Sequence, residues 1–130
     1  MNKVNFNDNS FINTKTYKDF IKDNPSTGCL NIRAYSANYA VPIDGVKIIV
    51  SKNIDNYEVI FYEGITDSSG MINSIILPTS STNSNDLEIP KATSYNIEAI
   101  YDNIIKKYSI LIYSNICIVQ DINIVPVGGI

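Results

Sequence analysis

Histidine, the side chain on which much enzymatic proton transfer and many metal sites depend, is absent from all 130 residues. Its absence excludes Ser-His and Cys-His nucleophile pairs and every histidine-ligated zinc, iron or copper site. The remaining candidates for chemistry are two cysteines, thirteen acidic residues and nine tyrosines. We expect no catalytic residues, no metal ligands, no cofactor and no enzymatic activity.

The two thiols, Cys29 and Cys117, each lie in strand-like sequence. Two thiolates cannot complete a closed four-ligand zinc site. Residues 1–9 contain no apolar stretch typical of a secretory signal, so we expect synthesis in the cytoplasm. In a reducing cytosol the sequence predicts two buried free thiols, and a disulfide forms only if the fold brings the two cysteines together.

The acidic residues show no pairing that favours catalysis or calcium binding. Asp67 stands alone among serines, which predicts a plain β-turn and not a calcium loop. Glycoside hydrolysis needs two carboxyl groups facing one cleft, and a small sandwich rarely forms such a cleft. The acids of the strands are scattered along the chain: Glu58, Glu63, Glu98, Asp102 and Asp121.

An internal Lys–Asn isopeptide bond requires a lysine on the first strand, an asparagine or aspartate on the last, and an acid between them. Glu98 and Asn123 lie on suitable strands, but the first strand carries Arg33, whose guanidinium stays protonated and cannot attack. Lys47 lies one strand away. The sequence therefore predicts no such bond.

Tyrosines and an excess of apolar residues are the strongest signals of binding. Nine tyrosines without tryptophan suit either core packing or a recognition surface, and the two uses stay open here. Residues 46–50, 104–113 and 116–125 carry apolar side chains on both strand faces, although a two-layer sandwich needs only one apolar face per strand. We expect a protein partner or self-association, with peptidoglycan as an alternative partner. The predicted interaction surface comprises Tyr35, Tyr62, Tyr108, Ile110, Ile112 and Tyr113.

The elements that position these residues follow from the local pattern. Residues 1–13 show no sustained period and predict a flexible arm. Residues 14–27 predict a short helix and connector, because Thr14 offers an N-cap, Tyr17, Phe20 and Ile21 have helical spacing, and Pro25 stops the helix. Residues 28–127 form the predicted β-sandwich domain, and residues 128–130 a tail.

Seven short strands with turn signals between them predict an all-β sandwich. The turns rest on Pro42, Gly45, Asp67 and Gly70, where glycine supplies a positive φ if one is needed. The expected strands span residues 29–35, 46–51, 57–62, 72–77, 94–101, 104–113 and 116–125.

The composition limits the kinds of partner that this chain can bind. Ten basic against thirteen acidic residues give a net charge of −3, so no basic surplus exists to bind nucleic acid. No apolar run approaches the roughly 18 residues that a spanning helix needs, so we expect no membrane insertion. The composition, with 45% hydrophobic and 18% charged residues, and the length of 130 residues together predict a single folded domain.

Residues 41–48, 66–70 and 77–78 together resemble the carboxypeptidase-regulatory-like family, whose domains are transthyretin-type sandwiches. Residues 95–99 and 122–126 are similar to later strands of that family. The resemblance implies a seven-stranded antiparallel Greek-key sandwich. The sequence departs from the family at Asp102-Asn103-Ile104, where a Gly-Tyr pair is usual, which leaves the register of that hairpin open.

Residues 17–25, running into the sandwich, resemble small Firmicute domains found alone or beside spore cortex-lytic enzymes. This resemblance implies association with the spore. A purine-degrading hydrolase also has the transthyretin-type fold, but its activity would require histidines that this chain lacks. We therefore expect a non-catalytic accessory domain for protein interaction or assembly. The alternative is a module that binds cell-wall glycan and positions a lytic enzyme.

Overall fold

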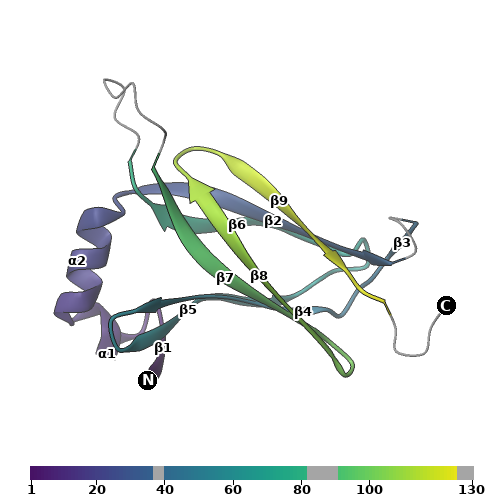
Figure 1. Ribbon diagram of the computed structural model, residues 1–130, viewed down its shortest axis with the longest axis horizontal. Helices are drawn as coiled ribbons and strands as arrows, with labels where there is room; N and C mark the ends of the chain where they lie inside the picture. The colour runs from purple at the N-terminus through teal and green to yellow at the C-terminus, as the bar shows by residue number, and fades with distance from the viewer. Residues whose placement is uncertain (37–39, 82–90, 126–130) are drawn as a thin grey trace.

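The computed structural model describes residues 1–36, 40–81 and 91–125. Two β-sheets pack face to face as the layers of a sandwich, and two short helices lie at one end of it (Figure 1). The elements are β1 (Asn2–Asn5), α1 (Asn9–Ile12), α2 (Lys15–Asp23), β2 (Ser26–Ser36), β3 (Val41–Pro42), β4 (Lys47–Ile54), β5 (Tyr57–Ile65), β6 (Met71–Thr79), β7 (Ala92–Tyr101), β8 (Ile104–Tyr113) and β9 (Cys117–Asn123).

The larger sheet, here sheet A, has the order β1-β5-β4-β7-β8. Its antiparallel part is built from two hairpins, β4–β5 and β7–β8, joined through β4 and β7. The register of β4 against β5 shifts between Val50 and Ser51. Such an irregularity bends the strand and increases its twist.

The smaller sheet, here sheet B, is centred on β2. β6 runs antiparallel to one side of β2, and the short β3 pairs with the last residues of β2 on the same side. β9 runs parallel to β2 on the other side. The far side of β9 has no strand partner among the described residues.

The two sheets enclose an apolar core of alternating inward-facing residues. Leu30 and Ile32 from β2 meet Ile48 and Val50 from β4, and all four are fully buried. Burial of this kind supplies the main driving force for folding. The remaining core members are Phe20, Ala34, Val46, Ile72, Ile75, Leu77, Tyr95, Ile97, Ala99, Ile110, Ile112, Ile122 and Ile124.

The prediction of a flexible arm over residues 1–13 is wrong for this structure. β1 pairs in parallel with β5, and α1 follows it with Asp8 as its N-cap. Phe11 is fully buried, and the ring of Phe6 stacks on Phe61 with centroids 4.5 Å apart. The sequence pattern missed this segment because Phe6 and Phe11 pack against residues far along the chain, Phe61 and Tyr57.

The predicted helix is present as α2. The Thr14 hydroxyl accepts from the backbone N–H of Tyr17, which confirms the N-cap. Phe20 and Ile21 pack on the core, and the helix ends at Asp23, two residues before Pro25.

A buried polar chain ties the end of α2 to the sandwich. Thr93 donates to the side chain of Asn24, whose amide in turn donates to the Phe20 carbonyl. The Thr79 hydroxyl donates to the Ile112 carbonyl at 2.6 Å. These bonds satisfy polar groups that would otherwise be costly to bury.

The strand count and pairing differ from the prediction. The described residues contain nine strands, and β1 and β3 are the two that were not expected. The sandwich is also not wholly antiparallel, because β1 pairs with β5 and β9 pairs with β2 in parallel. Neither short strand carries enough alternating residues to be detected from periodicity.

The four predicted turn residues lie in turns or beside them. Gly45 and Gly70 have φ angles of +77° and +74°. Asp67 accepts backbone N–H bonds from Ser69 and Met71, and Pro42 lies against Gly70. Of the predicted domain boundaries, residues 126–127 and the tail over 128–130 lie outside the described residues.

No helix in the described part of the chain is long and apolar enough to cross a membrane.

Candidate interaction surface

Two of the six residues predicted to form an interaction surface are core residues. Ile110 and Ile112 face inward from β8, with exposed fractions of 6% and 0%. Their register partners on β7, Tyr95 and Thr93, are also buried. The prediction was right that both faces of β8 are apolar, but it chose the inward face. Leu111, between the two, is exposed.

The four predicted tyrosines are not fully exposed either. Tyr35 is buried, and Tyr62, Tyr108 and Tyr113 are half-buried. Tyr62 and Tyr108 pack against the core. Every tyrosine among residues 1–36, 40–81 and 91–125 is buried or half-buried, so these rings form no open stacking platform.

Tyr108 joins the two sheets at one edge of the sandwich. Burial raises the pKa of its phenol, and a hydrogen bond from the backbone of Asn123 opposes that rise. Tyr108 is on β8, and Asn123 is the last residue of β9. The hydrogen bond between them therefore occupies the end of the β9 edge that faces away from β2.

The prediction of two free thiols is wrong, because Cys29 and Cys117 form a disulfide. The two cysteines are direct neighbours in the parallel pairing of β2 with β9, with Cα atoms 4.3 Å apart. They are 88 residues apart in the sequence, so only the tertiary pairing brings them together.

The disulfide lies on the outer surface of sheet B, within a patch of exposed apolar side chains. Ile76 on β6 pairs with Cys29 and is 60% exposed, and Val119 on β9 is 57% exposed. Ile116, in the turn before β9, is 50% exposed. We call this patch the disulfide face; it comprises Cys29, Cys117, Ile76, Ile116 and Val119.

The disulfide face is hollowed at one end. An open depression of about 210 Å³ is lined by Thr27, Gly28, Cys29, Ile76, Asn115, Ile116 and Cys117. An exposed apolar cluster of this kind marks a surface suited to contact with another apolar surface.

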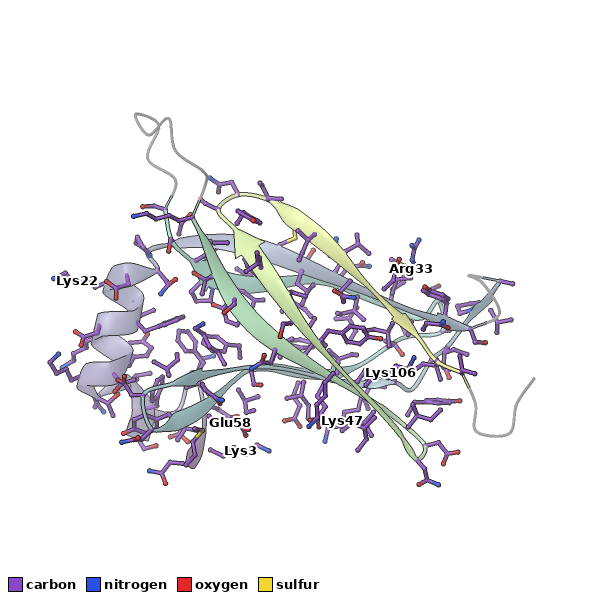
Figure 2. All side chains as sticks on the ribbon, viewed as in Figure 1. Lys3, Lys22, Arg33, Lys47, Glu58 and Lys106 are labelled. Carbon is purple, nitrogen blue, oxygen red and sulfur yellow. A yellow bond between two sulfur atoms is a disulfide. The ribbon has the colours of Figure 1, made fainter. Side chains whose placement is uncertain are left out.

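An ion pair borders the disulfide face. The Arg33 guanidinium on β2 donates to both carboxylate oxygens of Asp121 on β9, at 3.0 Å and 3.2 Å. Figure 2 shows Arg33 on the β9 side of the sandwich, opposite Lys3 and Glu58. The two charges neutralise each other within one chain, so the border adds no net charge to the face.

The outer surface of sheet A is different, because it carries a polar groove of about 280 Å³. The register places Ser51, Asn96 and Ser109 in one row across β4, β7 and β8, and Glu98 beside Lys107 in the next. The groove is lined by Ser51, Asn53, Glu58, Asn96, Ile97, Glu98, Lys107, Tyr108 and Ser109.

Charges around the groove are mixed in sign. The Lys3 ammonium lies 3.9 Å from Glu58, and Lys47 lies 3.5 Å from Glu63 on the same sheet. The Ser109 hydroxyl donates to the side-chain oxygen of Asn96 at 3.4 Å. The groove therefore offers amide, hydroxyl and carboxylate groups together.

The structure separates the residues considered for an isopeptide bond. Glu98 lies on β7 of sheet A, whereas Asn123 lies on β9 of sheet B and is exposed. Lys47 pairs with Glu63. Within the described residues, no three His, Cys, Asp or Glu side chains gather closely enough to hold a metal ion.

Lys52 is a partly buried basic residue. Burial lowers its pKa, and its ammonium donates to the Ser94 carbonyl at 2.8 Å and lies 5.7 Å from the Tyr95 ring centroid. These contacts cap the end of the core near α2. They give Lys52 a structural role.

No protein-family model matches the chain, and no curated protein matches its sequence. Among solved structures, the chain is similar to a 5-hydroxyisourate hydrolase of Klebsiella pneumoniae, with 13% identity and a TM-score of 0.47. The match covers 74% of this chain and 90% of that one. A likeness at this distance establishes neither a shared family nor a shared activity.

The residues of the disulfide face were only partly visible in the sequence. Residues 116–125 were noted as apolar on both faces, but Ile76 was not singled out. Its signal was the unbroken run Ile75-Ile76-Leu77, in which the middle side chain must face away from a one-sided core.

Proposed function

We propose that this chain is a non-catalytic assembly module that associates with further copies of itself through the disulfide face. The observation that carries the proposal is the cluster of exposed Ile76, Ile116 and Val119 around the bridged cysteines. Burying each of these side chains against an apolar partner contributes on the order of 1 kcal/mol.

The non-catalytic part of the proposal is supported by composition. The chain has no histidine, which removes the commonest general base and the usual activator of serine and cysteine nucleophiles. Its two cysteines are bonded to each other, so neither thiol serves as a nucleophile in this state.

We also propose that the module works in an oxidising setting, because a disulfide persists there and is reduced in the cytosol. Synthesis in the cytoplasm, expected from residues 1–9, stays a prediction. A spore-associated location, implied by the resemblance at residues 17–25, also stays a prediction.

Membership of the transthyretin-type, carboxypeptidase-regulatory-like family is a further proposal. It is supported by the two-sheet sandwich and by the turns at Gly45 and Gly70, both of which have positive φ.

The test of assembly is light-scattering mass across a range of protein concentrations. Ile76→Lys places a charge on the disulfide face and is expected to shift the population toward monomer at least tenfold. Ile65→Lys is the matched control, because Ile65 is 64% exposed but lies on sheet A. A wild-type monomer at every concentration, or equal effects of both variants, would overturn the proposal.

A second candidate function rests on the polar groove of sheet A. Its amides, hydroxyls and carboxylates are groups that hydrogen-bond the hydroxyls of a glycan, and its mixed charges suit a ligand of low net charge. Binding is tested by co-sedimentation with purified peptidoglycan sacculi. Asn96→Ala should reduce pelleting severalfold, whereas Ser94→Ala, two residues away on the same strand, should not. Failure of the wild type to pellet would exclude this candidate.

A further inference from the structure

The edge strands of the two sheets differ in how well they resist pairing with another chain. Proteins protect such edges with short strands, lysines, prolines and bulges. β1 has four residues and carries Lys3, and β3 has two residues and ends in Pro42. β8 carries Lys106 and Lys107.

The two long edges of sheet B contrast with each other. β6 contains Pro78 and has a positive φ at Ser74, and its register against β2 shifts between Leu30 and Ile32. β9 has seven residues, with no lysine, no proline and no register shift against β2. Of the edges formed by β1, β3, β6, β8 and β9, the β9 edge is thus the least protected.

The backbone direction of β9 follows from two hydrogen bonds. The Ile116 carbonyl accepts from Cys29, and the Ile124 N–H donates to the Tyr35 carbonyl. Even-numbered residues therefore direct their backbone groups toward β2. By alternation along the strand, Cys117 and Val119 direct their N–H and C=O groups outward.

Only the first half of this edge is open. At the far end, the backbone of Asn123 bonds to Tyr108 of β8. The stretch from Ile116 to Gln120 carries no formal charge and adjoins the exposed side chains of the disulfide face.

We infer that β9 pairs antiparallel with β9 of a second copy, about a two-fold axis near Ile118. In this register the outward N–H and C=O groups of Cys117 face those of Val119 in the second copy, and those of Val119 face Cys117. The same short segment of each copy therefore supplies the hydrogen-bond partners of the other. This inference rests on the proposed self-association and adds a second contact to it. Edge pairing joins the outward backbone groups of β9, whereas Ile76 lies on β6, on the other side of β2 from that edge, and stays exposed for contact with a further copy.

A second copy fits this edge better than a charged partner does. The whole chain has a net charge of −3, yet the pairing segment is uncharged, so two copies meet there without like charges in contact. Symmetric dimers of this isologous kind are the commonest assemblies of identical chains. The outcome is one continuous sheet across the two copies.

The variant Val119→Pro tests the pairing, because it removes an outward N–H while leaving the hydrogen bonds to β2 in place. We expect the dimer dissociation constant, measured by sedimentation equilibrium, to rise at least tenfold. Val119→Ala is the control: it shortens the side chain but keeps the N–H, and should change the constant only a few-fold. Circular dichroism checks that Val119→Pro is folded.

Amide hydrogen exchange on the wild type gives a second readout that needs no variant. The amides of Ile118 and Gln120 should be protected at every concentration, and those of Cys117 and Val119 only in concentrated samples. A dimer that survives Val119→Pro but dissociates on Ile76→Lys would overturn the edge pairing and leave the proposed function standing. A wild-type monomer at every concentration would overturn both.

Discussion

Gly70 and Gly45 adopt the same left-handed backbone conformation but have different surroundings. A Cβ atom built on Gly70 would lie 2.3 Å from the Ala34 carbonyl oxygen, whereas one built on Gly45 meets nothing within 4 Å. Gly45→Ala should therefore lower the free energy of unfolding by about 1 kcal/mol, from the backbone alone. Gly70→Ala should lower it by at least twice as much, because β2 must also move. Urea unfolding of both variants measures the difference, and equal losses would contradict the close contact.

Tyr95 makes the free energy of unfolding depend on pH in the alkaline range. Burial raises the pKa of its phenol, and the hydroxyl donates to the Pro78 carbonyl. The unfolded chain loses this proton near pH ~10, while the folded chain keeps it. The contribution of Tyr95 is therefore complete below pH ~10 and declines above it by up to about 1.4 kcal/mol per pH unit, until the raised folded pKa is reached.

Tyr95→Phe isolates this contribution. The wild type should be the more stable of the two at about pH 8, and its advantage should shrink by about 1 kcal/mol at about pH 11. Denaturant unfolding at both pH values gives the measurement. An advantage that does not change with pH would show that Tyr95 ionises equally in both states.

At the scale of elements, the segment β1–α1 completes the end of the sandwich beside α2 (Figure 1). Phe11 packs edge-on against Tyr17 and Tyr57, and Phe6 joins the same aromatic cluster. Phe11→Ala should therefore lower the free energy of unfolding by about 3 kcal/mol.

The neighbouring variant Ile12→Ala is the control for this prediction, because Ile12 is only half-buried. Its loss should be clearly smaller. A Phe11→Ala protein as stable as the wild type would restore the flexible arm that the sequence suggested. Thermal or urea unfolding decides between the two.

At the scale of the whole molecule, the disulfide closes a loop of 88 residues between the first and last strands of sheet B. Cross-links over loops of this length stabilise a fold by about 4 kcal/mol, mainly by restricting the unfolded chain. Reduction with a phosphine should lower the urea midpoint accordingly. Cys117→Ser should behave like the reduced wild type and show no further change on reduction, and a midpoint that reduction leaves unaltered would exclude this role.

Local patterns were enough to predict several features of the fold. The N-cap at Thr14, the apolar spacing of α2 and the alternation within β7 and β8 depend on neighbouring residues alone. The turns at Gly45 and Gly70 likewise follow from nearby residue types. The all-β class, the position of the helix and the approximate positions of seven strands could therefore be predicted, whereas several strand ends differ by up to three residues.

Other features depend on contacts between distant segments. The parallel pairing of β9 with β2 brings Cys29 to Cys117, and the register of β8 turns Ile110 inward and Leu111 outward. Ile110 and Leu111 are both apolar, so residue type alone does not show which of them faces the core.

The sequence by itself determined the class of fold, the local turns and caps, and the kinds of chemistry that the missing histidine removes. The tertiary structure alone decided which apolar faces are buried, which cysteines meet and which edge of the sandwich stays open. The reason is physical: a strand buries one face or the other according to its register, and register is set by partners far away in the chain.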